Sequence, residues 1–395
     1  MVESANVPTR AELVRRASDL VPVLRANAAW TDENRRLHEE TIEALADAGI
    51  FRMRAPARYG GFESDAQTLV DVGTELGRGD GSASWVASVY WIPGWMAGLF
   101  PDEVQDEVFS TPDVRVCGTL SPAGTAIPQP GGGVVLNGQW GFISGALHSH
   151  WQEIIAIRIP EDGQPEPIMG LVPIKELEIV DDWHVSGLRG TGSVTTVAKD
   201  VFIPEERVLS LGAVLSGQYA SVRNADSPMF RAPLLGVANA SAVGTVLGLA
   251  KAAKEVFLER MPNRKLTYTS YESQREAPIT HLRVADAALT IDRAEFHARR
   301  VADLVDAKGA TGEPWTLEER ARSRADVGVV CKLAKDAIDA LAMASGGSSI
   351  YNTVAMQRIN RDIQAINLHA LMAPDANFEL YGRILCGLEP NSAYI

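Results

Sequence analysis

The chain has 395 residues, 46% of them hydrophobic, which is enough for two or three packed units around a large core. Its 37 basic and 50 acidic residues give a formal net charge of -13 spread along the sequence, so we expect neither nucleic acid nor an anionic membrane as a main partner. The cysteines Cys117, Cys331 and Cys386 lie far apart, which favours neither a disulfide framework nor a cysteine metal site.

The first residues, MVESANVPTRAELV, lack the basic stretch and apolar segment that mark a secretory signal. No window of the sequence approaches the roughly 18 apolar residues that a membrane span requires. With so few cysteines, a reducing compartment fits best. We therefore expect a cytoplasmic protein that does not enter a membrane.

The chain begins with a helical region, from Thr9 to about Thr111. The tetrapeptide Thr9-Arg10-Ala11-Glu12 is a capping box that can satisfy the first free amides of a helix. Helical spacing of apolar residues predicts a second helix from Thr31 to Ala48, and Gly49 stands where such a helix would stop. We expect residues 1–112 to form an N-terminal helical domain.

The middle of the chain changes to short β-rich runs separated by Gly and Pro. The runs include Gly133 to Leu136, Glu153 to Ile157 and Thr195 to Val197. The tripeptide Leu136-Asn137-Gly138 is a hairpin signal. We expect residues 113–209 to form a small antiparallel barrel or sandwich.

After Ala232 the sequence returns to long helices rich in alanine and charge. They are separated by the loops Met261 to Pro278 and Lys308 to Trp315. Several helices of this length in series are typical of a bundle, which we assign to residues 210–395. The predicted order is therefore helices, strands and a helical bundle, an α+β fold.

Three common kinds of site find little support. The segment Gly187 to Ser193 is glycine-rich but lacks the Lys of a phosphate-binding loop and lies between strands, which favours a tight turn. His148 and His150 share one face of a strand, yet no third ligand stands at motif spacing, so we expect no metal site. The fragment Phe142 to Gly145 lacks the first glycine of a hydrolase nucleophile elbow.

Two segments carry chemistry beyond these. Residues 137–151 bring aromatics, a hydroxyl and imidazoles into one β-turn-β stretch, which suits either a planar cofactor such as an isoalloxazine ring or a packed core. Further on, Gln357 to Asp362 carries two arginines that can pair with phosphate or Asp. His369 lies about two helical turns beyond Asp362, so both can face one cavity, or the whole segment can be a salt-bridged bundle surface.

Taken together in this order, the motifs resemble those of the acyl-CoA dehydrogenase superfamily, closest to its two-component flavin-dependent monooxygenase branch. That branch includes the oxygenase component of p-hydroxyphenylacetate 3-hydroxylase, the steroid-catabolism hydroxylase and the ActVA-type polyketide hydroxylases. The resemblance covers nearly the whole chain. It comprises Arg36-Leu37 through Glu40-Thr41 and Ala44-Leu45, Pro56 through Gly60-Gly61, Asn137-Gly138 through Trp140, Ser144-Gly145, His148 and Trp151, Gly187 to Ser193 with Phe202-Ile203-Pro204, and Gln357-Arg358 through Arg361-Asp362 to His369.

The resemblance implies an acyl-CoA dehydrogenase-like fold and a homotetramer. It also implies a monooxygenase that receives reduced FMN or FAD from a separate reductase, reacts it with O2 to a C4a-hydroperoxyflavin, and hydroxylates an aromatic, polycyclic or polyketide-like molecule. Two other activities on this fold are N-hydroxylation of an amine and dehydrogenation of an acyl thioester. Many such dehydrogenases carry a catalytic Glu where this chain has Asn367-Leu368-His369-Ala370, so that base is missing here. A relative that only binds ligands would not need Ser144 and His369.

By the same resemblance, Ser144 is the partner of the flavin N5 and His369, with an unshifted pKa near 6.5, donates or relays a proton. Trp140 and the turn after it, with Thr119 and Ser121, would line the ring edge. Arg264 and Gly346-Gly347 would bind the phosphate end across a subunit contact.

The substrate side departs from the phenol hydroxylases. Those enzymes carry a substrate-binding His on the helix where this chain has Pro93, so simple phenol hydroxylation is not expected. We expect a large, aromatic pocket poor in charge, formed with Trp91, Trp95 and Met96. His148 would take the role of the base.

Overall fold

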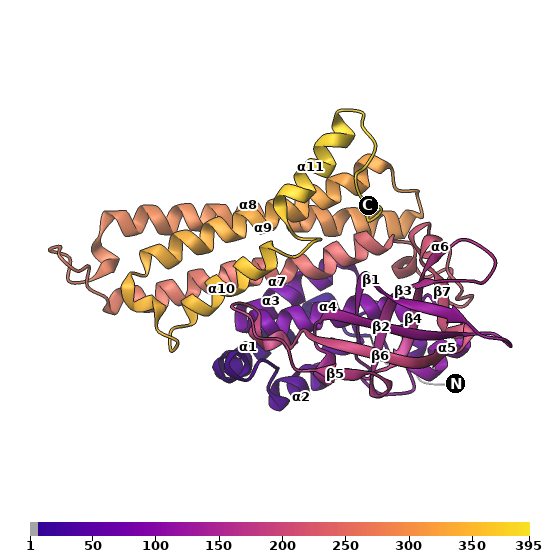
Figure 1. Cartoon of the computed structure of the whole chain (residues 1–395). Helices are drawn as coiled ribbons and strands as arrows, with labels where there is room; N and C mark the ends of the chain where they lie inside the picture. Colours follow the sequence, from indigo (N-terminus) through magenta and orange to yellow (C-terminus); the bar gives the residue numbers. More distant parts are fainter. Residues whose placement is uncertain (1–6) are drawn as a thin grey trace.

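The computed structural model describes residues 7–395 and joins an N-terminal set of helices, a central sheet and a long helical bundle (Figure 1). The helices are α1 (Arg10–Asn34), α2 (Glu39–Asp47), α3 (Ala66–Gly79), α4 (Gly81–Ala97), α5 (Asp102–Val108), α6 (Leu211–Leu215), α7 (Leu234–Arg260), α8 (Pro278–Thr311), α9 (Leu317–Ala344), α10 (Ala355–Asn367) and α11 (Pro374–Leu385). The strands are β1 (Val116–Pro128), β2 (Val134–Ile143), β3 (Trp151–Arg158), β4 (Glu166–Pro173), β5 (Glu178–Val180), β6 (Val194–Ile203) and β7 (Val208–Ser210). This order confirms the predicted α+β fold of N-terminal helices, central strands and a C-terminal helical bundle.

The first helices start and stop largely where the sequence indicates. The Thr9 hydroxyl accepts the Glu12 amide hydrogen bond at 3.3 Å, which caps α1, and Gly49 adopts a φ of +79° after α2. The predicted unbroken helix from Thr31 to Ala48 is wrong, because Arg35 turns left-handed (φ 57°) and separates α1 from α2. The His38 ring caps the new helix by accepting the Glu40 amide hydrogen bond.

The seven strands form one sheet in the order β5-β6-β2-β1-β3-β4-β7. Most neighbours are antiparallel, as predicted, but β1 pairs with β3 in parallel, so the sheet is mixed. The predicted hairpin at Asn137-Gly138 is wrong, because these residues lie inside β2, where Gly138 is paired with Gly124. The hairpin between β1 and β2 closes at Gly131 to Gly133 instead, whose positive φ angles suit glycine.

The long helix α7 forms the centre of the core between α3, α4 and the bundle (Figure 1). Glycines on α3 and α7 face each other, and a Cβ at Gly77 would stand 2.9 Å from the Thr245 carbonyl, so the two helices are in close contact. By length and composition α7 qualifies as a membrane span, contrary to our expectation for the sequence, but 94% of its apolar window is buried inside the protein.

Helix α4 lies between two hydrophobic core clusters. Trp85 and Trp95 belong to the cluster shared with α7 and one face of the sheet, whereas Tyr90 and Trp91 belong to the cluster shared with α1, α2 and the other face. A helix that is apolar all round is expected in such a position. The rotation of α4 therefore decides which of its aromatic residues meets which part of the molecule.

Candidate active site

Ser144 lies in a tight turn at the end of β2. Phe142 takes a left-handed conformation (φ 63°), and Gly145 does the same (φ 75°). A Cβ on Gly145 would stand 2.6 Å from the Tyr90 hydroxyl, so this position requires glycine. The Gly145 amide donates to the Thr191 carbonyl at 2.9 Å, which ties the turn to the segment 187–193.

Trp85 connects Ser144 with His369. Its indole N–H donates to the Ser144 hydroxyl at 3.3 Å, and its ring meets the His369 imidazole edge to face, with centroids 5.3 Å apart. Ser144 and Trp85 are buried, whereas His369 is accessible to solvent. The structure thus brings together two residues predicted from the sequence and adds a third that we had not singled out.

A row of buried hydroxyls continues from Ser144 into the glycine-rich segment. The Ser144 and Ser193 hydroxyl oxygens are 2.8 Å apart, and those of Ser193 and Thr191 are 2.6 Å apart. The Thr191 hydroxyl donates to the Leu188 carbonyl at 2.8 Å. The segment is the tight turn that its sequence predicted, with a 3-10 turn at Arg189–Thr191.

His369 follows α10 and is held as a neutral ring. Its Nδ1 accepts the Leu371 amide hydrogen bond at 3.3 Å, which leaves the ring hydrogen on Nε2. Although the residue is accessible to solvent, the protein around it lowers the pKa of the imidazole to about 4, first by desolvation and then through the charge of Arg324. The expected unshifted pKa near 6.5 is therefore wrong, and near neutral pH His369 is a neutral donor.

His148 has different neighbours. Its Nδ1 lies 3.9 Å from the Glu39 carboxylate at the start of α2, and its main-chain carbonyl accepts from the Arg115 guanidinium. Burial lowers the pKa of His148, and Glu39 partly offsets this. Its Nε2 is buried and has no partner within residues 7–395. Both His148 and Ser144 lie near the β2 turn, and the indole N–H of Trp85 donates to Ser144.

The aromatic residue exposed at this turn is not the predicted one. Trp140 is completely buried, and its indole donates to the Ile155 carbonyl at 2.8 Å, so its side chain cannot serve as the open platform that we expected. Phe142 is 74% exposed and meets Trp183 edge to face at 5.7 Å. Strand alternation would place these two residues on the same face of β2, because they are two positions apart. They are separated by the left-handed conformation of Phe142 and the register shift between Trp140 and Ile143, which the sequence pattern does not reveal.

Of the predicted substrate-pocket residues, Trp91 and Trp95 lie on other sides of α4 than Trp85. Trp91 donates to the Ile50 carbonyl at 2.7 Å and Trp95 to the Met229 carbonyl at 3.0 Å, so each indole anchors α4 to a neighbouring segment. Both rings are also enclosed. Pro93 and Met96 are buried as well. At about 100° per residue, Trp91 and Trp95 lie roughly 240° and 280° around α4 from Trp85.

Met96, Val89 and Ile92 of α4 do share the side of Trp85, and Met96, about 20° away, is enclosed. Val89 and Ile92 lie within about 40° of Trp85 around the helix axis, and both are only partly buried. A helical-wheel comparison of the whole segment could have found them. The wall that α4 presents beside Ser144 and His369 is therefore indole and aliphatic side chains without charge.

The remaining predicted contacts fall in two places. Thr119 is half-buried and Ser121 is exposed, in the part of β1 where its register against β3 shifts. Arg264 donates to the Ser348 hydroxyl at 2.6 Å beside Gly346, with Gly347 adjacent, so these loop residues do meet each other. Their loops lie at the end of the bundle away from the sheet (Figure 1), so one chain does not bring them to Ser144.

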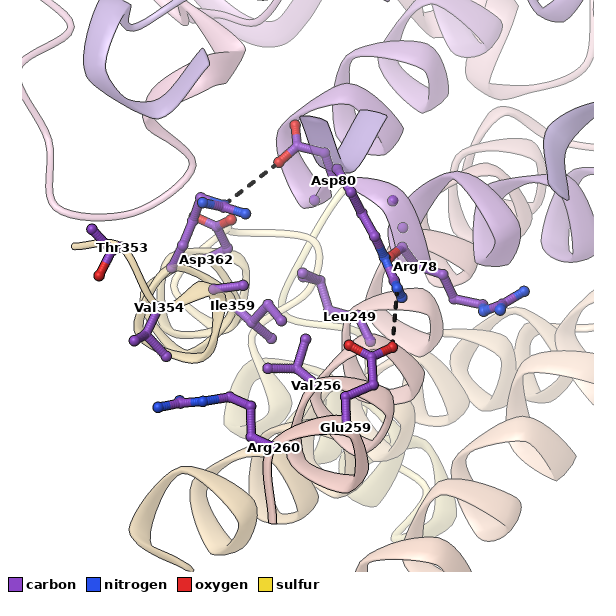
Figure 2. A pocket seen from close by; sticks show the side chains of 17 residues that line it. Arg78, Asp80, Leu249, Val256, Glu259, Arg260, Thr353, Val354, Ile359 and Asp362 are labelled. Atoms are coloured by element: carbon purple, nitrogen blue, oxygen red, sulfur yellow. Dashed lines mark hydrogen bonds and ion pairs between the residues drawn. The ribbon is translucent and has the colours of Figure 1, made fainter. Parts of the chain in front are cut away.

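A pocket of about 270 Å³ lies at the junction of α3 and α4, against α7 and α10 (Figure 2). Asp80 and Asp362 line it, and burial raises the pKa of Asp80 to about 6 and that of Asp362 to about 7. Asp362 accepts the Leu188 amide hydrogen bond at 2.7 Å. Of the two alternatives for this segment, a cavity shared by Asp362 and His369 is therefore not what the structure shows. Asp362 holds the 187–193 turn through the Leu188 amide, whereas His369 contacts Trp85.

The chain is similar to known proteins over nearly its whole length. Residues 12–108 match the acyl-CoA dehydrogenase N-terminal domain and residues 240–374 the acyl-CoA dehydrogenase C-terminal domain. It is 32% identical to the flavin-dependent monooxygenase oxygenase subunit HsaA of Mycobacterium tuberculosis, over 95% of this chain and 96% of that protein. It is also 32% identical to the oxygenase component of the FADH(2)-dependent resorcinol hydroxylase of a Rhizobium species, over 99% of this chain and 98% of that one. The structure of XiaF from a Streptomyces species in complex with FADH2 and glycerol matches with a TM-score of 0.91 and 32% identity, covering 97% of both chains.

Proposed function

Because this chain belongs to the flavin-dependent monooxygenases of the acyl-CoA dehydrogenase family, and is an oxygenase component that uses reduced flavin from a separate reductase, we propose that the surroundings of Trp85 are its active site. The observation that carries the proposal is the contact of one indole with both Ser144 and His369. When bound, the reduced flavin supplies the electrons that activate O2 for transfer of one oxygen atom to the substrate.

The side chains present fit such a cofactor. Ser144 offers a hydroxyl at the end of a strand, beside the exposed ring of Phe142, and a flat aromatic ligand needs such a polar contact next to an apolar surface. Thr119 and Ser121 lie where β1 is irregular, and we assign them to the polar edge of the ring.

Each residue then has a defined task. Ser144 fixes the ring by a hydrogen bond at N5. His369, neutral with its hydrogen on Nε2, donates a hydrogen bond to the reacting oxygen without carrying a charge into the site. Trp85, with Val89 and Ile92, covers the site with apolar surface and keeps water out.

For the substrate we propose an aromatic molecule that is hydroxylated at carbon. The wall formed by α4 carries no charge that would hold an amine or a carboxylate, and two of the similar proteins are named hydroxylases or monooxygenases. Acyl thioester dehydrogenation has less support, because Asn367, Leu368 and Ala370 around His369 provide no carboxylate base. Among residues 7–395, no contact at this site supports N-hydroxylation of an amine.

We further propose that the enzyme is a cytoplasmic homotetramer of chains with domains 1–112, 113–209 and 210–395. Along α8 the exposed side chains of Ile279, Leu282, Leu289 and Phe296 form an apolar stripe, three of them seven residues apart, which is suited to burial against another copy. Assembly would also allow Arg264 and the Gly346-Gly347 turn to reach the phosphate end of a flavin held by a neighbouring subunit.

The test is an anaerobic mixture of the protein with reduced FMN or FAD, followed by oxygen. We expect a delay, compared with free flavin, before the absorbance of oxidised flavin returns, and a shorter delay in Ser144→Ala and His369→Ala. A panel of phenols, naphthols and indoles supplied during the delay should give a hydroxylated product. Immediate return of oxidised flavin with wild type and both variants alike would refute the placement of the site.

A further inference from the structure

We propose that Thr191 and Ser193 fix the Ser144 hydroxyl as a hydrogen-bond acceptor, so that the site selects reduced over oxidised flavin. The inference rests on the proposed function, in which Ser144 meets the flavin N5. It concerns positioning residues: neither Thr191 nor Ser193 is placed against the cofactor. The direction of each hydrogen bond follows from which of its two atoms carries the hydrogen.

The direction of the row is set at its inner end by a carbonyl, which can only accept. The Leu188 carbonyl accepts from the Thr191 hydroxyl at 2.8 Å, from the Thr191 amide at 3.2 Å and from the Trp183 indole at 3.1 Å. A hydroxyl has one hydrogen. Because the Thr191 hydroxyl donates its single hydrogen to the Leu188 carbonyl, it can only accept a hydrogen bond from its next neighbour.

The next two hydroxyls, Ser193 and Ser144, are therefore oriented in the same direction. Ser193, 2.6 Å from the Thr191 hydroxyl, must donate to it. Ser193 then has no hydrogen left for Ser144, which lies 2.8 Å away, so Ser144 must donate to Ser193. The hydrogen of Ser144 therefore points into the protein.

The contact at the outer end of the hydroxyl row, between Trp85 and Ser144, is consistent with this direction. An indole N–H can only donate, so the Ser144 oxygen accepts from Trp85 at 3.3 Å. Ser144 has now used its hydrogen and one lone pair. What remains for a ligand is its second lone pair, so toward the site Ser144 is an acceptor only.

The row is enclosed and held at both ends. Thr191, Ser193 and Ser144 are only 2%, 4% and 7% exposed, so exchange of these hydrogen bonds with water is hindered. Leu188 is left-handed (φ 51°), and its amide donates to Asp362 at 2.7 Å, which holds the terminal carbonyl in place.

Flavin N5 changes its hydrogen-bonding character with redox state. Reduced flavin carries a hydrogen on N5 and can donate it, whereas oxidised flavin presents a lone pair there. The free lone pair of Ser144 can accept a hydrogen bond from N5–H of the reduced form. It forms no hydrogen bond with the N5 lone pair of the oxidised form. An unmade hydrogen bond of this kind changes affinity by about tenfold.

The test compares dissociation constants of oxidised and anaerobically reduced flavin, measured by fluorescence or calorimetry in the intact protein. In Ser193→Ala the Ser144 hydrogen loses its acceptor and can turn toward the ligand. The preference for reduced flavin should then fall by about tenfold. Thr191→Val, at the other end of the row, should also lower the preference for reduced flavin. It serves as the second variant if Ser193→Ala does not fold.

Matched control variants distinguish an effect of the hydroxyl row on flavin preference from a general loss of stability. Thr191→Ser keeps the hydroxyl and should keep the wild-type preference. Thr196→Val removes a buried hydroxyl of β6 that has no partner within residues 7–395, and it should also leave the preference unchanged. An unchanged preference in both Ser193→Ala and Thr191→Val would overturn the inference.

Ser144→Ala distinguishes a wrong hydrogen-bond direction from a wrong placement of the flavin site. If it weakens reduced flavin while the Ser193 and Thr191 variants behave like wild type, the hydrogen-bond direction is wrong and the proposed site stands. If Ser144→Ala changes neither affinity, the flavin does not meet Ser144, and the proposed site and this inference both fail.

Discussion

Trp85 and His369, 284 residues apart in the sequence, meet edge to face with ring centroids 5.3 Å apart. The same indole donates to Ser144, so one side chain of α4 joins the end of strand β2 to the segment after α10. Aromatic pairs of this geometry contribute about 0.5–1.5 kcal/mol beyond the area they bury. Trp85 is therefore the residue through which displacement of one half of the site would be transmitted to the other.

Replacing Trp85 by Phe tests this link. The substitution keeps a ring beside His369 but removes the N–H that orients Ser144. We expect the yield of hydroxylated product per reduced flavin consumed to fall by about fivefold, corresponding to one lost hydrogen bond. Trp91→Phe removes an indole N–H from another face of the same helix, where it holds Ile50. That control should lower the melting temperature without changing the yield, and equal loss of yield in both variants would contradict the prediction.

The pH dependence tests the state of His369. Because its pKa in the folded protein is about 4, below the usual value near 6.5, we expect no step near pH 6.5 in the hydroxylation rate. His369→Ala should lower the rate by about tenfold, by the same factor from pH 5.5 to 8. A factor that shrinks as the pH rises through 6.5 would mean that the imidazolium is the active form.

The same shift makes a statement about stability. Between pH 4 and 6.5 the unfolded chain binds a proton at His369 that the folded chain does not. The contribution of this residue to the free energy of unfolding therefore rises with pH across this window and is lost as the pH falls. Thermal unfolding of His369→Gln between pH 4.5 and 7 should show a shallower acid loss than wild type.

Asp362 changes the free energy of unfolding with pH in the opposite direction to His369. Its pKa is raised to about 7 by burial and by Asp80, so between pH 4 and 7 the folded chain holds a proton that the unfolded chain has lost. Stability from this group is present at low pH and falls as the pH rises to 7. Asp362→Asn still offers an oxygen to the Leu188 amide, and its stability relative to wild type should increase by at least about 1.4 kcal/mol between pH 4.5 and 7. Asp162→Asn, in an exposed loop, is the matched control variant.

Gly187 tests whether the 187–193 turn positions the site. A Cβ there would overlap the Arg361 carbonyl, so Gly187→Ala must displace the turn and its hydroxyls. We expect a loss of about 1–3 kcal/mol in unfolding free energy and weaker binding of reduced flavin. At Gly141 of β2 the nearest atom to a new Cβ is 3.6 Å away, so Gly141→Ala is the matched control. Tight flavin binding by Gly187→Ala at reduced stability would show that the turn has only a structural role.

The apolar stripe of α8 predicts the effect of a single charge on assembly. Leu289→Glu places a carboxylate in the middle of the proposed contact and should reduce the mass measured by analytical ultracentrifugation. Val222→Glu adds the same charge at an exposed apolar residue outside α8 and should leave the mass unchanged. A tetramer that survives Leu289→Glu would place the contact elsewhere.

Much of the architecture and two central residues could be predicted without coordinates. The order of helices, strands and bundle follows from local periodicity, and the tight turn at 187–193 follows from its glycines and its place between strands. Ser144 and His369 were proposed because they stand in short motifs that resemble those of the flavin-dependent monooxygenases, and the structure brings both to the same indole. The break at Arg35 and the strand position of Asn137 were missed, since tertiary packing overrode the local signals there.

The sequence alone determined which residue types are available and the order in which the chain presents them. Only the tertiary structure decided that Trp85, and not Trp91, Trp95 or Trp140, lies between Ser144 and His369. It also decided that His369 is neutral and that the Ser144 hydrogen points inward. The rotation of α4 depends on residues far away in the chain, and a pKa or a hydrogen-bond direction depends on every neighbour at once, so neither can be read from local pattern.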